Sequence, residues 1–446
     1  MKNSWLLVPL ITLSSYTLSP EYLIDLARTL NEVNLCDTAL THINKYIASD
    51  ASHTIDAYMQ RGCIYFKMKR FLDAINDFDT VIAHNPNSIR AQHCKAYALM
   101  QSEQLDKAIS IYQELIDQHP NDAHLRLGLS LALLSKGDFE RGWHEHEWRW
   151  EAFHAKRPEY NNPVWDGSAD LNNKTILITC EQGSGDTFQF IRYAKLIKEM
   201  GAHVIVQTSL ILKTILEQCP YIDHVICSTD TLPAFDFHAS TMSLPFLFKT
   251  CLDTVPTHIP YLYANPELVT YWCKKLAADT NFKIGLCWQG NPNYSIQELR
   301  DIVKAKSCHV HTFLPLADIK GISLYSLQKI GGEDQLEHIN EKLHITAFSD
   351  DFDNSRGRFM DTAAVITNLD LVITIDTSIA HLAAGLGKPT WVLLPKPSDW
   401  RWMLKRTDTP WYPNMRLFRQ STPGDWDAVI QNIVHALQQE FLENIS

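Results

Sequence analysis

Two consecutive stretches of 34 residues decide how the first part of this chain folds. They read HTIDAYMQRGCIYFKMKRFLDAINDFDTVIAHNP over residues 53–86 and NSIRAQHCKAYALMQSEQLDKAISIYQELIDQHP over residues 87–120. Each stretch ends in a proline, Pro86 or Pro120, and proline cannot continue a helix. Self-similarity at a fixed period is the signature of a repeat architecture, in which stacked units bury a shared apolar face. The period therefore predicts an array of helical units separated by breaks.

Small and aromatic side chains recur at the same period. The pairs related by 34 residues are Gly62 and Ala96, Ala74 and Ala108, and Phe78 and Tyr112. Ala39 precedes this series by 35 residues, and Gly142 extends it by a further 34. The pattern resembles the tetratricopeptide repeat, in which small residues let two antiparallel helices approach and an aromatic ring fills the space beside them. We therefore expect tetratricopeptide repeats over residues 20–152, best defined over 53–120, with weaker end units that face water.

The repeats leave two roles open. A stacked array of this kind offers a concave surface to a protein partner or an extended chain. Alternatively, the repeats only support the rest of the protein or mediate dimerisation. Both alternatives remain hypotheses at the level of the sequence.

Composition limits the class of protein. The 446 residues carry a formal net charge of −11, whereas nucleic-acid-binding proteins usually have a basic face, so no nucleic-acid partner is expected. The ten cysteines form no CxxC pair, which is typical of reduced thiols in the cytoplasm. His144 and His146 would lie on different faces of a helix, and His309 and His311 have no further ligands in the sequence. Neither a metal site nor a bound cofactor is therefore predicted.

The first 19 residues allow two interpretations. An apolar run over residues 5–11, which follows Lys2, resembles a weak signal peptide, but it is short and interrupted by Pro9, and no A-x-A cleavage site follows. The preferred interpretation is an apolar strip that covers the first helix of the repeats. No stretch reaches the roughly 18 to 20 apolar residues that span a bilayer, so no transmembrane segment is predicted.

A polar segment with two prolines, residues 153–173, is expected to link the repeats to a second region. Four tryptophans gather just before and within it, namely Trp143, Trp148, Trp150 and Trp165. Exposed tryptophans can recognise a sugar. More often such a cluster packs a junction between domains, which is the interpretation that we prefer.

After Lys174, short apolar runs rich in β-branched residues alternate with helical patterns. The expected strands are 175–179, 203–206, 224–226, 284–288, 322–327, 371–375 and 390–394. The expected helices are 187–200, 209–218, 312–319, 361–367, 378–386 and 426–442. This alternation is typical of parallel sheets with helices on both faces. It predicts two Rossmann-like halves, residues 174–265 and 282–420, which face each other across a cleft, with a connection over 266–281 and a terminal segment over 421–446. Ligands of such sheets bind beyond the carboxyl ends of the strands.

A glycine-rich turn, CEQGSGD over residues 180–186, follows the first expected strand. Its glycines let the backbone turn sharply and approach a ligand, and the next helix start offers N–H groups to an anion or a hydroxyl. The spacing matches neither GxGxxG, nor a Walker loop, nor a GxSxG nucleophile elbow. Asp186 is either a helix cap or a general base at the mouth of the cleft, and Glu181 is the next candidate for the base.

Two further turns belong to the second expected half. The turn IDTSIAHLA, residues 375–383, leads from a strand into a helix whose free N–H groups and dipole suit a diphosphate and the charge that builds on a departing nucleotide. The alternative is an ordinary capped helix. The sequence WQGN, residues 288–291, ends a strand and opens into a long polar loop. That loop closes at KAKS, residues 304–307, which supplies a lysine for a phosphate.

These turns carry a family resemblance. The stretches 181–190 and 376–389 resemble the bacterial heptosyltransferase-like family, glycosyltransferase family 9, and especially its repeat-fused members. LPKPSDWRW at 394–402 and WYPNMRLFRQ at 411–420 add to the resemblance, which covers nearly the whole chain. The O-linked N-acetylglucosamine transferases have a similar architecture, but their motifs match poorly.

The resemblance implies a GT-B fold and an inverting transfer from a nucleotide-diphosphate sugar that needs no metal. It implies that Asp186 deprotonates the acceptor, that Lys306 contacts the donor phosphates, and that residues 376–381 hold the diphosphate and the sugar. The residues expected to bind donor or substrate are Gly183, Ser184, Gly185, Trp288, Gly290, Asn291, Lys306, Gln328, Asp376, Thr377, Ser378, Ile379, Ala380 and His381. Lysine stands at 306 where the repeat-fused group is expected to have arginine, and the segment 293–304 is unusual, so the donor preference stays open.

Three functions follow as hypotheses. The leading one is transfer of a hexosyl- or heptosyl-type sugar to a hydroxyl of a glycan, lipid-linked or protein acceptor, with the repeats binding acceptor or partner. The second is a protein O- or N-glycosyltransferase whose repeats select a polypeptide. The third is a catalytically silent scaffold. The acidic run at 350–353 mimics a DxD metal motif, but no strand precedes it, and a solvated loop is expected there.

Overall fold

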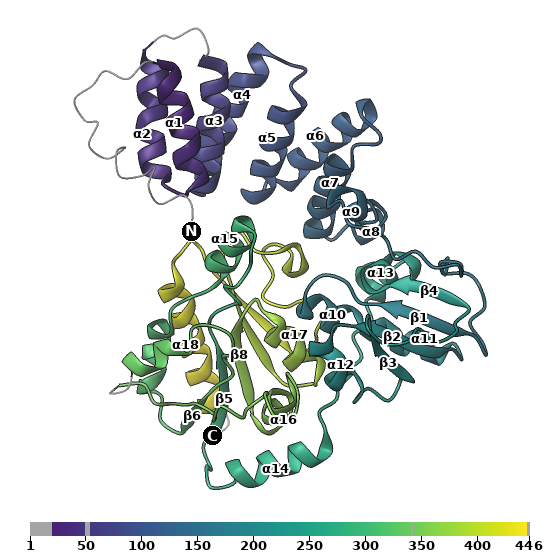
Figure 1. Ribbon diagram of the computed structural model, residues 1–446. Helices are drawn as coiled ribbons and strands as arrows, with labels where there is room; N and C mark the ends of the chain where they lie inside the picture. The colour runs from purple at the N-terminus through teal and green to yellow at the C-terminus, as the bar shows by residue number, and fades with distance from the viewer. Residues whose placement is uncertain (1–19, 50–53, 340–341, 444–446) are drawn as a thin grey trace. The chain divides into compact units, whose positions relative to one another are not determined.

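Paired helices follow one another through the first part of the chain (Figure 1). The computed structural model describes residues 20–49, 54–339 and 342–443, so the apolar strip expected over residues 1–19 lies outside the described residues. The chain divides into two compact units between Ala132 and Leu133, and each unit is considered by itself. The helices of the first part are α1 (Pro20–Glu32), α2 (Cys36–Ala48), α3 (Thr54–Lys67), α4 (Phe71–His84), α5 (Ile89–Gln101), α6 (Leu105–Gln118) and α7 (Ala123–Lys136).

Close packing at small residues explains the 34-residue period. A Cβ atom on Gly62 of α3 would lie 2.5 Å from the ring of Phe78 in α4, so no larger side chain fits there. Gly128 of α7 meets the ring of Tyr112 in α6 at the same distance. The two prolines that end the repeats lie between α4 and α5 and between α6 and α7. The predicted helical repeats are confirmed.

The second unit contains two sheets in which every pairing of neighbouring strands is parallel. The first sheet has the order β3-β2-β1-β4 and consists of β1 (Thr175–Thr179), β2 (His203–Thr208), β3 (His224–Cys227) and β4 (Phe237–Ser240). The second has the order β10-β9-β8-β5-β6-β7 and consists of β5 (Phe282–Cys287), β6 (Ile322–Ser326), β7 (Ile345–Thr346), β8 (Leu371–Ile375), β9 (Thr390–Leu394) and β10 (Met415–Arg419).

Helices connect these strands. Those before and within the first half are α8 (Phe139–His146), α9 (Arg149–Ala152), α10 (Ser184–Phe190), α11 (Arg192–Glu199), α12 (Leu210–Leu216) and α13 (Leu244–Leu247). Those of the second half are α14 (Pro266–Leu276), α15 (Gln297–Lys306), α16 (Met360–Asn368), α17 (Ser378–Gly385) and α18 (Trp426–Glu443). Short 3₁₀ helices are η1 (Thr241–Ser243), η2 (Leu252–Thr254), η3 (Val310–Asp318), η4 (Asp334–His338) and η5 (Trp400–Trp402). Within the described residues, no helix is long and apolar enough to cross a membrane.

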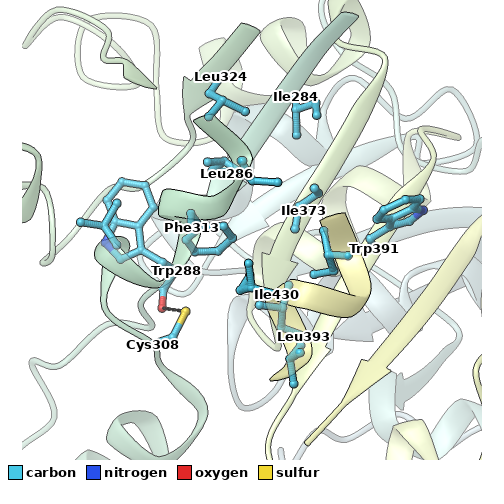
Figure 2. Packing of buried hydrophobic residues seen from close by; sticks show 14 of the residues in the cluster. Ile284, Leu286, Trp288, Cys308, Phe313, Leu324, Ile373, Trp391, Leu393 and Ile430 are labelled. Atoms are coloured by element: carbon cyan, nitrogen blue, oxygen red, sulfur yellow. Dashed lines mark hydrogen bonds between the residues drawn. The ribbon is translucent and has the colours of Figure 1, made fainter. Parts of the chain in front are cut away.

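The core of the second sheet is apolar throughout (Figure 2). Leu286 of β5, Ile373 of β8 and Leu393 of β9 are fully buried, and Phe313 of η3 and Ile430 of α18 cover them. Parallel strands covered on both faces need such continuous apolar runs. The fold class predicted from the sequence, helical repeats followed by two Rossmann-like halves, is confirmed.

Several elements differ from the prediction. The long polar loop expected after residue 291 contains the helix α15, and the connection expected over 266–281 contains α14. The segment 310–318 is a 3₁₀ helix instead of an α-helix, and Pro315 within it cannot supply the N–H that an α-helical turn needs. The strands β4, β7 and β10 were not predicted, because they are short or carry polar residues on a buried edge.

The tryptophans before the linker are part of the interior. Trp143 of α8 is 1% exposed, and its ring centroid lies 5.3 Å from that of Trp400 and 5.8 Å from that of Phe190. Trp150 and Trp165 are also buried. The packing interpretation therefore holds for these three rings, and α8 and α9 pack within the second unit.

Candidate active site

A cavity of about 850 Å³ opens at the carboxyl ends of the two sheets. The first half contributes residues 182–186 and Ile211, and the second half contributes the remaining lining. The structure brings together these residues named from the sequence: Gly183, Ser184, Gly185, Asp186, Gly290, Asn291, Lys306, Asp376, Thr377, Ser378, Ile379 and His381. The turns that the sequence singled out are more than 100 residues apart along the chain, and they meet because each follows a strand at the same edge.

Asp186 makes two contacts at the start of α10. Its Oδ2 accepts a hydrogen bond of 2.8 Å from the backbone N–H of Gly183, so it caps the helix. Its Oδ1 forms an ion pair with the guanidinium of Arg401, which comes from η5 in the other half. A carboxylate offers about four lone-pair sites, so each oxygen keeps a site for a further donor. The cap is therefore present, and the carboxylate can still receive a proton.

Arg401 is the centre of a buried polar network. Its Nε donates to Oε1 of Gln189 at 2.7 Å, and its Nη1 donates to Oδ1 of Asp399 at 3.0 Å. The guanidinium lies over the ring of Trp400, 4.4 Å from the centroid. Burial opposes the charge of Arg401, but Asp399 and Asp186 outweigh that effect and raise its pKa. The arginine thus stays charged and fixes the orientation of the Asp186 carboxylate.

Lys306 and Asp376 face each other across the cavity floor. The Nζ atom lies 3.8 Å from Oδ2, which is too far for a direct hydrogen bond. Burial raises the pKa of Asp376, and the nearby ammonium of Lys306 opposes this shift. The lysine is therefore near an acid but not tightly bound to it, and it can turn toward an anion in the cavity.

The start of α17 has fewer free donors than expected. The hydroxyl of Thr377 accepts the N–H of Ile379 at 3.3 Å, and the carbonyl of Thr377 accepts the N–H of Ala380 at 3.1 Å. The expectation that the N–H groups of residues 378–381 are all free is therefore corrected. The positive end of the helix dipole still points at the cavity, because Thr377, Ser378 and Ile379 line it.

His381 lies one turn into α17 and is buried. Its Nδ1 lies 2.8 Å from the hydroxyl of Tyr412, and its ring stacks on Trp402 at 5.4 Å. Burial, followed by the charges of Arg401, Arg192 and Lys306, places the pKa of His381 well below its ordinary value. The imidazole is therefore neutral at neutral pH.

Gly185 explains how the two halves come so close at this point. A Cβ atom on Gly185 would lie 3.2 Å from Cδ2 of His381 and 3.6 Å from Cα of Ser378. The glycine thus serves the packing of α10 against α17. This is a more specific reason for glycine than the sharp turn that the sequence suggested.

Three of the named residues do not line the cavity. Trp288 is fully buried in the core, and Ala380 is enclosed within α17. Gln328 is buried and holds the backbone at the end of β5: its Oε1 accepts the N–H groups of Trp288 and Gln289 at 3.0 Å each. Its place in the fold is therefore that of a support for the cavity wall.

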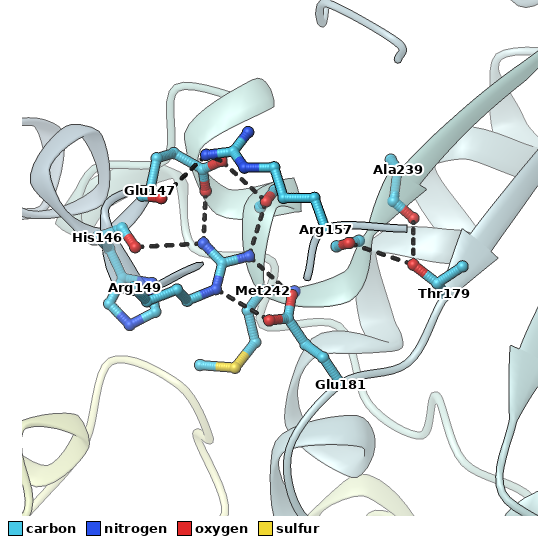
Figure 3. A network of polar contacts seen from close by, with 10 residues as sticks. His146, Glu147, Arg149, Arg157, Thr179, Glu181, Ala239 and Met242 are labelled. Atoms are coloured by element: carbon cyan, nitrogen blue, oxygen red, sulfur yellow. Dashed lines mark hydrogen bonds and ion pairs between the residues drawn. The ribbon is translucent and has the colours of Figure 1, made fainter. Parts of the chain in front are cut away.

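Glu181, the second candidate for a base, is held in an ion pair (Figure 3). Both of its carboxylate oxygens accept from Arg149 of α9, at 2.9 and 2.7 Å. Arg149 also donates to Glu147 at 2.7 Å and to Ser243 at 2.9 Å, and its side chain is 1% exposed. Glu181 does not line the cavity. This geometry makes it a structural residue that joins α9 to the first sheet.

The acidic run at 350–353 is only partly solvated. Asp350 and Asp351 are exposed, but Phe352 and Asp353 are buried. The carboxylate of Asp353 accepts the N–H and the hydroxyl of Thr362 at 3.0 and 2.5 Å. The run therefore includes a cap for α16. The described residues contain no group of three or more His, Cys, Asp or Glu side chains arranged to hold a metal ion.

Two cationic residues of the cavity were missed as site residues. Arg401 lies within a stretch that the resemblance quoted, and its pairing with Asp186 spans 215 residues, so no local pattern announces it. Arg358 lies in the polar segment before α16 and lines the cavity, and its surroundings in sequence carry no signal for a site.

Comparisons with known proteins agree on the repeats. The tetratricopeptide repeat family matches residues 55–88 and 99–142. A curated relative, Protein FlbA of Caulobacter vibrioides, is 23% identical over 450 residues, covering 93% of this chain and 72% of FlbA.

Among solved structures, the glycosyl transferase family 9 protein from Veillonella parvula DSM 2008 is similar, with a TM-score of 0.43 and 14% identity over 62% of this chain and 99% of that one. A tetratricopeptide repeat protein from Parabacteroides merdae has a TM-score of 0.29 and 25% identity over 33% of this chain and 56% of that one. At these TM-scores, neither structure bears on the function of this chain.

Proposed function

We propose that this chain is an inverting, metal-independent glycosyltransferase that moves a sugar from a nucleotide-diphosphate donor to a hydroxyl acceptor. The observation that carries the proposal is the arrangement of charge in the cavity. A carboxylate, Asp186, stands on the wall from the first half, whereas Lys306 and the start of α17 stand on the wall from the second half. A base and an anion site on opposite walls suit a direct displacement.

In the proposed reaction, Asp186 accepts the proton of the acceptor hydroxyl as its oxygen bonds to the anomeric carbon. The bond between that carbon and the diphosphate breaks in the same step, and the diphosphate leaves with the bonding electrons. Lys306 and the dipole of α17 stabilise the negative charge that develops there. Arg401 positions the base, since it holds one carboxylate oxygen while Gly183 holds the other.

The acceptor is the less defined partner. The tetratricopeptide match at residues 55–88 and 99–142 favours an acceptor or partner that includes a polypeptide, because such repeats bind extended chains on their concave surface. A glycan or lipid-linked acceptor remains the alternative. The sequence resemblance to glycosyltransferase family 9 supports the transfer chemistry, not the choice among these acceptors.

A nucleotide screen tests the proposal. The full chain is heated with ADP, GDP, UDP, CDP or dTDP, and the shift in melting temperature is recorded; the sugar nucleotides of the best base are then assayed for diphosphate release. We expect one base to stabilise the protein and at least one of its sugars to be turned over. Absence of binding to all five diphosphates would favour the scaffold hypothesis.

A further inference from the structure

Arg358 is a cavity-lining cation without a partner. It is half-buried in the loop before α16, and within the described residues its guanidinium makes no hydrogen bond or ion pair. Its one close side-chain contact is the ring of Phe359, with the centroid 5.3 Å from the guanidinium carbon. By contrast, Arg401 in the same cavity is bound by two carboxylates. An unpaired charge in a partly buried site is costly unless an anion joins it.

The acids near Arg358 are already engaged. Both oxygens of Asp353 accept from Thr362, and burial raises the pKa of Asp353. Glu333 is exposed, and its Oε2 accepts the N–H of Ile330 at 3.2 Å. Burial lowers the pKa of Arg358 in spite of these two acids. The protein itself therefore does not neutralise this guanidinium.

The backbone holds Arg358 in place from both sides. Gly357 has φ +101° and Phe359 has φ +67°, a left-handed conformation that a bulky residue rarely adopts. The ring of Phe359 packs edge-on against Phe188 of α10 at 5.2 Å, so the unusual conformation is fixed by a contact with the other half. Residues held this way cluster at ligand clamps and active sites. The position of Arg358 is thus built into the fold.

Arg358 and Lys306 act on different parts of the cavity. Lys306 faces Asp376 at the end of β8, on the side of Arg401 and Asp186. The charge of Arg358 acts on Cys287 at the end of β5 and on Glu333 beyond β6. The strand order places β5 between β8 and β6, so the two cations lie toward opposite sides of the β5 end. In the proposed function the sugar must reach Asp186, so the sugar-bearing phosphate belongs on the Lys306 side.

We propose that Arg358 binds the phosphate attached to the nucleoside, while Lys306 faces the phosphate that carries the sugar. This inference rests on the proposed function, because it assumes a nucleoside diphosphate in the cavity. It makes Arg358 a donor-binding residue that discriminates by reach: a nucleoside monophosphate retains the contact with Arg358 and lacks the contact with Lys306.

Calorimetric titration of the full chain tests this division. The probes are the nucleoside diphosphate that binds best in the screen and the matching monophosphate. Arg358→Gln should weaken both by about tenfold to a hundredfold, the range expected for a lost charge-assisted contact. Lys306→Gln should weaken the diphosphate alone. Arg358→Lys should recover part of the loss, and Arg141→Gln, which removes an exposed arginine of α8 outside the cavity lining, should change neither affinity.

The possible failures are distinguishable. If wild type binds the monophosphate and Arg358→Gln binds it equally well, the inference is overturned and the proposed function stands. If Arg358→Gln weakens only the diphosphate, the assignment of the two phosphates is overturned. If wild type binds no nucleotide, the proposed function fails and the inference fails with it. A melting temperature of Arg358→Gln close to wild type rules out misfolding as the cause of a lost affinity.

Discussion

Asp186 of α10 and Arg401 of η5 form an ion pair that joins the two halves of the α/β unit at the wall of the cavity. The same carboxylate caps its own helix through Gly183. Asp186 is therefore fixed at both oxygens before any ligand arrives. Its capping role and its proposed catalytic role thus coexist, and substitutions must separate them.

Asp186→Asn is expected to lower turnover by about 10² to 10⁴, the usual contribution of a general base. The amide oxygen of asparagine can still accept the N–H of Gly183, and Arg401 keeps Asp399 as its partner, so the melting temperature and the affinity for nucleotide should stay close to wild type. Single-turnover rates at saturating donor measure the effect. Asp399→Asn is the comparison, since it removes the other acid of Arg401 and should cost less. A variant that keeps more than about a tenth of the rate assigns Asp186 to capping alone.

Glu181→Gln should give the opposite pattern. The glutamate receives two hydrogen bonds from a buried arginine, and weakening them leaves part of the charge of Arg149 uncompensated. We expect a loss of about 1 to 3 kcal/mol in the free energy of unfolding, with turnover per folded molecule close to wild type. Denaturant unfolding and rates corrected for the folded fraction separate the two effects. Glu151→Gln, an exposed glutamate of α9, is the control. Full stability combined with lost turnover would return Glu181 to the list of bases.

His381→Asn should flatten the loss of stability in acid. The pKa of His381 lies well below its ordinary value because the ring is buried, so below about pH 6.5 the unfolded chain binds a proton that the folded protein does not. The free energy of unfolding then falls as the pH falls, by about 1.4 kcal/mol per pH unit for one such group. Denaturant unfolding at pH 7, 6 and 5 should give a shallower decline in the variant by that amount. His224→Asn, at an exposed position, controls for the loss of an imidazole. Equal slopes in His381→Asn and wild type would mean that the ring is accessible to protons.

Removing the repeats should succeed at one boundary and fail at another. A chain that begins at Leu133 keeps α8 and α9, whereas one that begins at Phe153 loses Trp143 from its contact with Phe190 and Arg149 from its pair with Glu181. We expect the longer chain to fold and bind nucleotide and the shorter one to aggregate through uncovered apolar surface. Size-exclusion chromatography and thermal melting measure this. Two chains with the same melting temperature would contradict the packing of α8. If the longer chain binds nucleotide but no longer modifies the acceptor, the repeats recruit that acceptor.

Turnover should survive treatment with EDTA. Lys306, Arg358 and the start of α17 are proposed to meet the charge of the diphosphate, so no cation is needed at the leaving group. The assay compares diphosphate release before and after chelation, and after addition of Mg²⁺ or Mn²⁺. Complete loss on chelation that is restored by either ion would refute the metal-independent mechanism.

The sequence alone determined the repeats, seven of the ten described strands and the turns that surround the cavity. These features follow from local rules: a 34-residue period brings small residues against aromatic rings, and apolar runs after glycine-rich or capped turns form buried parallel strands. The elements that escaped prediction, such as α15 and β10, carry charged residues at positions where periodicity is weak.

Only the tertiary structure decided which charges are paired. Glu181 and Asp186 lie five residues apart and look equally suited to act as a base, yet Arg149 occupies the first, whereas the second faces the cavity. Arg358 and Arg401 look equally ordinary in the sequence, yet one is bound by two acids and the other by none within the described residues. The physical reason is that periodicity specifies which face of an element is buried, whereas the partner of a charge depends on how distant elements pack, and that packing is a property of the whole fold.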